Sequence, residues 1–345
     1  MRIAINAQLL NFCDFGIRTY LKCLTDQLVK IDKTNEYALI LDRTQNKLWE
    51  HLKLPSIVNK GNFDLFFTPD HVLPLLPVKC KKVITVHDLS FVKFPKLFSF
   101  AKRIYKQLMT PVSIRRADRI IAVSENTKKD IVKLFKIDPD KVTVVYNGVS
   151  GEFKKVEDKA VLDKVRNKYG LPNHYILFVG TIEPRKNIIN LIKAFKKSAA
   201  DHHLVIAGKA GWMSDALIKE IKSHDKVQWV ENVETKDLPA LYSMASLFTY
   251  PSMYEGFGLP ILEAMACGAP VITSNISSMP EVAGDAAVLI DPNNADELAQ
   301  AIKDILKNEV LRKSLTSRGY EQAKRFSWDK CAKETIKVYE SCFNT

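Results

Sequence analysis

The sequence predicts an α/β protein with two doubly wound parallel sheets. In both halves, short apolar runs rich in β-branched residues alternate with amphipathic stretches, the pattern of parallel strands covered by helices. The chain has 345 residues, 46% of them hydrophobic, which is too long for one ordinary core and sufficient for two. A polar, charged passage from Gly151 to about Asn173 separates the halves. We therefore expect two domains.

Each half contains six candidate strands. In the first half they are residues 2–7, 37–41, 64–68, 82–86, 119–123 and 141–145. In the second half they are residues 175–180, 203–208, 227–230, 247–250, 270–274 and 288–290. A final amphipathic stretch from Trp328 to Cys342 keeps Ala332, Ile336 and Tyr339 on one side, as a helix that docks on a domain would.

The composition favours a cytoplasmic protein. No apolar run approaches the roughly 20 residues needed to span a bilayer. The opening string MRIAINA is strand-like and lacks the features of a secretory signal. The six cysteines contain no CxxC pair, which predicts reduced thiols rather than a zinc site or a disulfide framework.

The positive charge is concentrated in the first half. Residues 1–150 contain 25 lysines and arginines against 14 aspartates and glutamates, so they carry +11 of the total +12. Such a field attracts phosphates, an anionic membrane or nucleic acid, and a lysine-rich solvated surface explains it equally well. Residues 91–116 interleave aromatic and basic side chains. This stretch fits a helix lying on an anionic membrane, or a packed helix with its lysines outside.

Two glutamates, Glu255 and Glu263, stand eight positions apart in the second half. Between them, Gly256 and Gly258 allow a ligand to approach the backbone, and a helix from about Leu259 would direct its N-terminus at a phosphate. Carboxylates in such places can accept hydrogen bonds from sugar or ribose hydroxyls. Taken alone, two glutamates at a glycine turn are more often surface residues.

The surrounding string YPSMYEGFGLPILEAMACGAPVI, residues 250–272, resembles the E-x7-E signature region of family 4 retaining glycosyltransferases. The resemblance implies that Glu255 faces the donor sugar and that Glu263 binds the ribose. It also implies that the amides around Phe257, Gly258 and Leu259 meet the donor diphosphate, with Gly256 among the donor-binding residues.

A second passage, FVGTIEPRKN at residues 178–187, ends a strand and opens a helix with two adjacent cations, Arg185 and Lys186. Fixed positive charge stabilises a departing nucleoside diphosphate more strongly in the transition state than in the ground state. The passage resembles the family's phosphate-binding strand end, with Gly180 at the strand end and Lys186 matching the family's lysine. Thr181 stands where an arginine commonly follows the glycine, so Arg185 is expected to compensate.

A third region joins GKAGW at residues 208–212 to VQWVENV at residues 227–233. In the family this region lies near the nucleobase, which implies base recognition by backbone atoms around Val230. Trp212 and Trp229 are expected to be packing residues rather than stacking platforms.

In the first half, VITVHDLSF at residues 83–91 places His87 at the carboxyl end of a buried strand, where open α/β sheets bind ligands. A lone histidine there is more often structural, but the string resembles the family motif whose histidine reaches the donor. Gly16 follows the first strand and is expected to admit a phosphate. It fits a simple turn equally well, and it is not part of a GxGxxG motif.

The resemblance extends from residue 1 to about residue 340. It implies the GT-B fold, in which two Rossmann-like domains, residues 1–155 and 156–326, face a central cleft. Residues 327–345 are then a terminal helix that crosses back to the first domain. The expected catalytic residues are His87, Arg185, Lys186 and Glu255.

The implied function is retaining transfer of a hexose from a nucleotide-diphosphate sugar to a glycan or lipid-linked acceptor in surface polysaccharide synthesis. Mannose from GDP-mannose is the favoured donor. We expect no cofactor and no nucleic-acid partner. We also expect no metal, because the DxD string Asp138–Asp140 precedes a first-half strand, away from the expected donor site. The protein is expected at the inner face of the cell membrane if it is peripheral, and the oligomeric state is open. Two alternatives remain, a nucleotide-sugar epimerase and a non-catalytic scaffold that binds nucleotide sugars.

Overall fold

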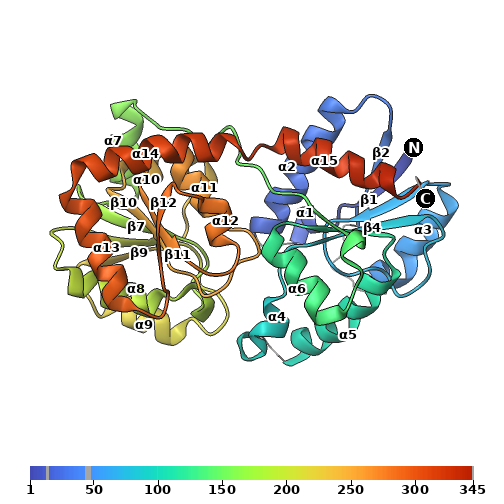
Figure 1. The fold of residues 1–345 in the computed structure, drawn as a ribbon, viewed down its shortest axis with the longest axis horizontal. Helices are drawn as coiled ribbons and strands as arrows, with labels where there is room; N and C mark the ends of the chain where they lie inside the picture. Colours follow the sequence, from blue (N-terminus) through green and yellow to red (C-terminus); the bar gives the residue numbers. More distant parts are fainter. Residues whose placement is uncertain (13–14, 43–47, 99, 344–345) are drawn as a thin grey trace. The chain divides into compact units, whose positions relative to one another are not determined.

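The computed structural model describes residues 1–12, 15–42, 48–98 and 100–343 (Figure 1). The chain divides into two compact units. Met1–Gly148 and Ser327–Thr345 form the first unit, and Val149–Phe326 form the second. No helix among the described residues is long and apolar enough to cross a bilayer.

The boundary between the units differs from the predicted one at residue 155. Residues 149–155 belong to the second unit, because this segment packs there. The Phe153 ring meets the Tyr242 ring edge-on at 6.1 Å, and directly after the segment the Val156 N–H donates to the Ser243 Oγ at 3.0 Å. The polar composition of this segment gave no sign of these contacts.

The first unit contains a parallel six-stranded sheet in the order β2-β1-β3-β4-β5-β6. Its strands are β1 (Arg2–Asn6), β2 (Glu36–Ile40), β3 (Leu65–Thr68), β4 (Lys81–Val86), β5 (Arg119–Ala122) and β6 (Val142–Val144). Its α-helices are α1 (Leu9–Phe12), α2 (Phe15–Ile31), α3 (Leu54–Lys60), α4 (Ser90–Lys93), α5 (Phe100–Arg116), α6 (Glu125–Phe135) and α15 (Trp328–Ser341).

The second unit contains another parallel six-stranded sheet, in the order β12-β11-β10-β7-β8-β9. Its strands are β7 (Tyr175–Val179), β8 (His203–Ala207), β9 (Val227–Val230), β10 (Leu247–Tyr250), β11 (Val271–Ser274) and β12 (Ala287–Ile290). Its α-helices are α7 (Lys159–Tyr169), α8 (Ile188–Ser198), α9 (Asp215–Lys222), α10 (Leu238–Met244), α11 (Leu259–Ala266), α12 (Met279–Ala283), α13 (Ala295–Lys307) and α14 (Glu309–Lys324). This strand order is that of the Rossmann fold.

The prediction of two parallel α/β sheets is confirmed, and each strand begins and ends within one residue of its predicted range. The strands are easy to find because parallel sheets are covered on both faces, so their strands are continuous apolar runs. In β7, for example, Tyr175, Ile176, Leu177 and Phe178 are all completely buried.

The last helix, α15, packs on α2 in the first unit, and the two lie side by side in Figure 1. Its predicted apolar side is buried, with Ala332 and Tyr339 inaccessible and Ile336 packed against the same core. Just before this helix the chain passes very close to Gly148. A Cβ atom on Gly148 would lie 2.1 Å from the backbone nitrogen of Trp328, so only glycine fits there without displacing the backbone.

Candidate active site

The second sheet has its topological switch point between β7 and β10. From β7 the chain continues outward to β8 and β9, and it then returns to add β10, β11 and β12 on the other side. Open α/β sheets bind ligands outside the carboxyl ends of the strands at this point, because the connections diverge there. The loops that follow β7 and β10 carry the cations and the first glutamate of the predicted site.

The loop after β7 brings Arg185 and Lys186 to this edge of the sheet. A single 3₁₀ turn (Pro184–Lys186) is followed by Asn187, whose backbone is left-handed with φ of 62°, and α8 then begins. The Asn187 side chain donates hydrogen bonds to the carbonyls of Pro251 and Pro292, which ties this loop to the loops after β10 and β12. Lys186 is thereby held in a buried position, only 7% exposed.

The Glu255 carboxylate is the centre of a charged cluster. Its Oε1 accepts a hydrogen bond from the Lys186 Nζ at 2.7 Å, and its Oε2 lies 3.0 Å from Nη1 of Arg185. Arg185 also forms an ion pair with Glu183 at 2.6 Å, and Lys186 donates to the Tyr250 hydroxyl at 2.6 Å. Each cation therefore already has a carboxylate partner, and a bound diphosphate would have to share these cations.

Burial and the neighbouring cations act in opposite directions on this cluster. Burial alone would raise the pKa of Glu255, but the charges of Arg185 and Lys186 outweigh it and hold the pKa at about 2. Burial lowers the pKa of Lys186, and the Glu255 carboxylate works against that shift. Glu255 is thus ionised at any physiological pH, and it fixes both cations in place.

The segment from Glu255 to Leu259 leads directly into α11. Gly258 precedes the helix with φ of 108°, a conformation that side chains rarely adopt. The backbone amides of Gly258 and Leu259 donate to no other residue that the structure describes, as expected at a helix N-terminus. These amides can bind an anion.

Glu263 lies one turn inside α11, half-buried. Its Oε2 accepts a hydrogen bond from the Tyr242 hydroxyl at 2.9 Å. Burial raises the pKa of Glu263 to about 7, against the opposing effect of the Tyr242 hydrogen bond. The two glutamates of the signature therefore differ sharply, since one is held ionised by cations and the other titrates near neutral pH.

The region around Val230 is held by backbone contacts. The Gly208 N–H donates to the Val230 carbonyl at 3.0 Å, and the Gly180 N–H donates to the Ala207 carbonyl at 2.9 Å. A Cβ atom on Gly208 would lie 1.9 Å from the Gly180 carbonyl oxygen. The strand ends at Gly180 and Gly208 can therefore approach each other only because residue 208 is a glycine.

The expectation for the two tryptophans holds for one of them. Trp229 is half-buried, and its indole N–H donates to the Gly208 carbonyl at 2.8 Å. Trp212 is 55% exposed, so the packing role predicted for it is wrong. Gly211 anchors the preceding loop, with its N–H donating to the Ile182 carbonyl, and this leaves the Trp212 side chain outside the core.

In the first unit, His87 follows β4 as predicted and is half-buried. Its Nε2–H donates to the Pro69 carbonyl at 2.8 Å, and the Tyr20 ring meets the imidazole edge-on at 4.7 Å. Burial lowers the pKa of His87, which favours the neutral imidazole. Gly16 lies in the first turn of α2 rather than in a loop, and it is exposed.

Some contacts at the charged cluster could not be predicted from the sequence. Ser277, with φ of 61°, accepts a hydrogen bond from the Glu255 N–H and donates to the Glu255 carbonyl. Ser278 donates to the carbonyls of Glu255 and Phe257. Nothing in the string SNISS, residues 274–278, distinguishes it from an ordinary turn. Tyr250, at the start of the signature string, contacts Lys186 without having been assigned a role.

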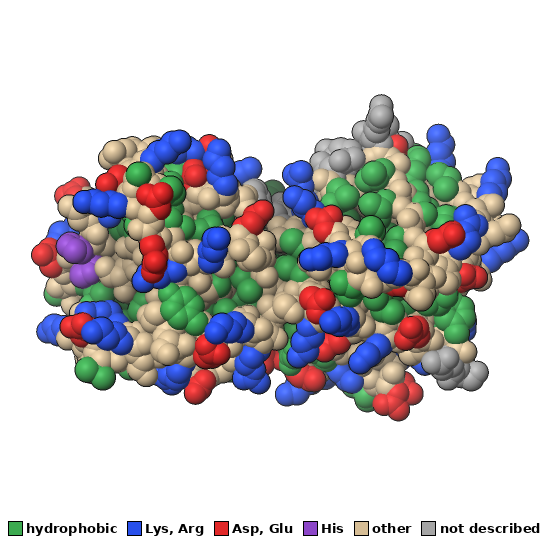
Figure 2. All heavy atoms as spheres, turned by 90° about the horizontal axis from the view of Figure 1, so that it is seen from above, with side chains coloured by type: hydrophobic (Ala, Val, Ile, Leu, Met, Phe, Trp, Pro, Cys, Tyr) green, Lys and Arg blue, Asp and Glu red, His purple; other side chains and the backbone are tan. Residues whose placement is uncertain are grey.

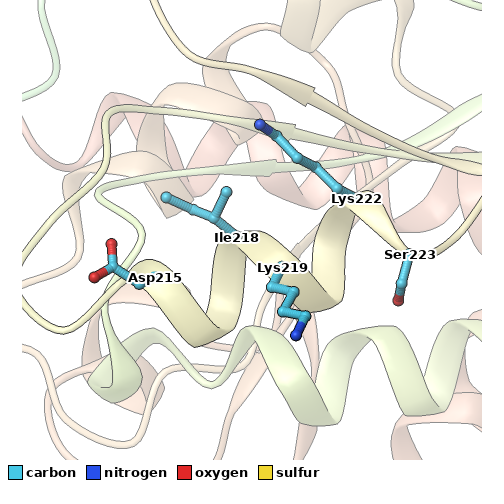
Figure 3. A pocket seen from close by; sticks show the side chains of 5 residues that line it. All are labelled: Asp215, Ile218, Lys219, Lys222 and Ser223. Atoms are coloured by element: carbon cyan, nitrogen blue, oxygen red, sulfur yellow. The ribbon is translucent and has the colours of Figure 1, made fainter.

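Two other places in the described residues bring together no converging polar groups. The hollow along α9 is lined by Asp215, Ile218, Lys219, Lys222 and Ser223, whose side chains point in different directions (Figure 3). Asp138 caps a short turn before β6 by accepting the Asp140 N–H at 2.9 Å. No group of three or more potential metal ligands occurs in the part of the chain that the structure describes.

The fold and the charged cluster define an α/β protein with two buried cations at the switch point of its second sheet. Comparison with known sequences gives the family. The family model described as Glycosyl transferases group 1 matches residues 162–322, and the model described as Glycosyltransferase Family 4 matches residues 30–153.

Two curated relatives are mannosyltransferases. The O-antigen chain mannosyltransferase B of Escherichia coli is 36% identical over 274 residues, which cover 77% of this chain and 72% of the relative. The O-antigen chain mannosyltransferase RfbU of Salmonella typhimurium is 32% identical over 258 residues, 74% of this chain and 68% of the relative. The chain therefore belongs to the group 1 glycosyltransferases, and it is an enzyme that transfers a hexose, as the resemblance implied.

Solved structures share the fold. HepE of Anabaena, solved in complex with UDP-glucose, superposes with a TM-score of 0.79 at 18% identity and covers 99% of this chain and 100% of its own. The sucrose-phosphate synthase of Thermosynechococcus elongatus gives a TM-score of 0.78 at 21% identity, with 99% of each chain covered. These likenesses support the GT-B assignment.

Proposed function

We propose that this enzyme transfers mannose from GDP-mannose to a glycan or lipid-linked acceptor, with retention of the anomeric configuration, in surface polysaccharide synthesis. The choice of mannose rests on the names of the two mannosyltransferase relatives. The observation that carries the donor site is the Lys186–Glu255–Arg185 cluster, which lies at the switch point beside the amides of Gly258 and Leu259.

In this proposal each part of the donor is bound by its own group of residues. Lys186 and Arg185 bind the diphosphate and stabilise its growing charge as it departs, and the amides that begin α11 bind the same phosphates. Glu255 holds the cations and accepts hydrogen bonds from the donor sugar. Glu263 binds the ribose diol, the backbone near Val230 contacts the base, and His87 contacts the donor from the first unit. The departing phosphate assists deprotonation of the acceptor, and no metal is needed.

A ligand panel tests the donor. Thermal unfolding of the protein should be followed with GDP, GDP-mannose, UDP and UDP-glucose, each with and without magnesium. Binding to the folded state stabilises it by about 2.7 kcal/mol at a ligand concentration 100 times Kd. We expect selective stabilisation by the guanosine ligands, independent of magnesium. Stabilisation by uridine ligands alone would contradict the GDP-mannose assignment.

Product analysis separates the alternatives. Transfer to an acceptor, with an α-linked product by NMR, supports the proposal. Conversion of the donor into an isomeric nucleotide sugar without any acceptor indicates an epimerase. Binding without turnover under all conditions indicates a scaffold.

We also propose a peripheral membrane location, which the exposed side of α5 supports. Phe100, Ile104, Leu108 and Val112 recur every four residues and are 69%, 36%, 66% and 43% exposed. The other side of α5 packs into the first unit through residues such as Met109 and Ile114. An ordinary packed helix would expose polar residues instead.

The charge around α5 matches an anionic bilayer. Residues 91–116 contain seven lysines and arginines and no acidic residue. On the face drawn in Figure 2, by contrast, lysine and arginine side chains are scattered among acidic and hydrophobic ones. An apolar stripe with basic surroundings is the arrangement by which amphipathic helices bind anionic membranes.

A further inference from the structure

The sheet of the first unit has a topological switch point of its own. Of the residues near it, only His87 has a role in the mechanism proposed above. Strand β1 lies between β2 and β3, and the chain passes from β1 to β2 on one side before returning to β3 on the other. The residues that directly follow β3 are Pro69, Asp70 and His71. By the rule that places the donor cluster in the second unit, Asp70 stands where a ligand of the first unit would bind.

One oxygen of Asp70 is occupied and the other is open. Oδ1 accepts the backbone N–H of His71 at 2.7 Å and also lies 2.7 Å from the Nδ1 of the same residue. The His71 Nδ1 makes no hydrogen bond among the described residues, so this second contact is electrostatic. Oδ2 accepts no hydrogen bond from any residue that the structure describes, and the Asp70 side chain is 25% exposed.

The surroundings keep this carboxylate charged and in place. The His71 side chain is buried, and its ring stacks on Phe91 with the centroids 5.4 Å apart and the planes at 12°. Burial alone would raise the pKa of Asp70, but His71 and, to a lesser degree, Lys106 outweigh it and hold the pKa well below its usual value. The Lys106 Nζ lies 5.4 Å from the centre of the same Phe91 ring.

Asp70 is also tied to the predicted catalytic histidine. The Pro69 carbonyl, one residue before Asp70, accepts the Nε2–H of His87 at 2.8 Å. Strands β3 and β4 pair in parallel, so their carboxyl ends lie next to each other. The loop after β3 therefore carries the open carboxylate, and its Pro69 carbonyl also holds the His87 imidazole that follows β4.

We infer that Asp70 binds the acceptor and that its Oδ2 accepts a hydrogen bond from a hydroxyl group of an acceptor sugar. A fixed carboxylate repels phosphate and attracts neutral hydroxyl donors. The group that binds here is therefore an uncharged, hydroxyl-bearing sugar unit rather than a phosphate-bearing end of the acceptor. This inference rests on the proposed transfer reaction, and it adds the chemistry of the second substrate.

Asp70→Asn tests the role, because it keeps the shape of the side chain and removes the charge. Two reactions should be compared, slow hydrolysis of the donor by water and transfer to a panel of neutral glycosides such as p-nitrophenyl mannosides and glucosides. We expect the KM for the glycoside to rise about tenfold, because hydrogen bonds to charged groups are roughly twice as strong as neutral ones. Hydrolysis and the KM for the donor should stay within twofold of the original protein.

Asp64→Asn is the matched control. Asp64 lies just before β3 and is exposed, whereas Asp70 lies just after β3. The two variants therefore remove the same charge from opposite ends of one strand. The control should change none of these values. An Asp70→Asn protein with an unchanged KM for the glycoside overturns the inference. An equal fall in hydrolysis and transfer, together with a lower unfolding temperature, also overturns it, because it indicates a purely structural role.

Failure of the proposed function can be distinguished from failure of the inference about Asp70. If the original protein hydrolyses another nucleotide sugar but not GDP-mannose, the donor assignment fails while the comparison of variants proceeds with that donor. If no neutral glycoside increases donor consumption by the original protein, the inference about Asp70 fails whichever donor is used.

Discussion

The Lys186 Nζ lies 2.7 Å from the Glu255 Oε1, and both side chains are more than nine-tenths buried. The residues are 69 positions apart, and they meet because β7 and β10 are neighbours at the switch point of the second sheet. Removing one partner of a buried ion pair leaves an uncompensated charge. The loss of folding stability is typically about 3–5 kcal/mol.

Lys186→Met should reduce transfer by about 10²–10³-fold, the usual effect of removing one group that stabilises developing negative charge. Methionine has a similar volume, and Arg185 still pairs with Glu255, so the protein should fold. Lys197→Met is the control, because Lys197 is an exposed residue on α8. Steady-state transfer rates and unfolding temperatures of both variants provide the measurement. A Lys186→Met enzyme with near-normal rates would remove Lys186 from the proposed mechanism.

Glu263 should make folding stability depend on pH. Its folded-state pKa of about 7 exceeds the ordinary value of 4.5, so the folded protein holds this proton more tightly than the unfolded chain. The contribution is fully present below pH 4.5 and is lost as pH rises toward and through 7. Glu263→Gln retains an acceptor for the Tyr242 hydroxyl and removes the titration.

The difference in unfolding temperature between Glu263→Gln and the original protein should therefore grow from about pH 5 to pH 8 in favour of the variant. Glu297→Gln, which makes the same substitution at a half-buried glutamate on α13, serves as the comparison. A constant difference across this range would contradict the raised pKa of Glu263.

Gly148→Ala should destabilise the protein by about 1–3 kcal/mol, the usual cost of overpacking. The new Cβ atom would lie 2.1 Å from the nitrogen of Trp328 and 2.4 Å from the carbonyl carbon of Ser327, and neither backbone can move without displacing the start of α15. Gly151→Ala, where no atom lies within 4 Å, should be neutral or slightly stabilising. Urea denaturation measures both, and equal stability of the two variants would disprove the close approach.

The exposed stripe of α5 should bind anionic vesicles. We expect sedimentation with vesicles rich in phosphatidylglycerol, weak binding to pure phosphatidylcholine, and release by salt, because screening weakens the electrostatic part. Phe100→Ser with Leu108→Ser should abolish binding and leave transfer to a water-soluble acceptor unchanged. Val310→Ser removes another exposed apolar side chain, 78% accessible on α14, and should have no effect. Equal binding by all three proteins would disprove the membrane proposal.

The sequence by itself determined the twelve strand positions and the string that carries Glu255 and Glu263. Both are local signals, since a buried parallel strand is a continuous apolar run and the signature residues lie within one loop and the helix after it. The tertiary structure decided what those residues touch. Periodicity could not show that Glu255 meets Lys186, because their contact depends on strand order.

The dependence on tertiary contacts also explains two predictions that were wrong and one residue that the sequence did not single out. Trp212 has a large apolar side chain of the kind that usually packs in a core. It is exposed because the Gly211 N–H is bonded to the Ile182 carbonyl, which keeps the next residue outside the core. The polar residues 149–155 look like a linker, but they belong to the second unit, where the Phe153 ring meets the Tyr242 ring. Asp70 is one ordinary aspartate in the sequence, and only the position of β3 beside β1 and β4 places it at a switch point. All three depend on contacts between segments far apart in the chain, which local patterns of hydrophobicity do not encode.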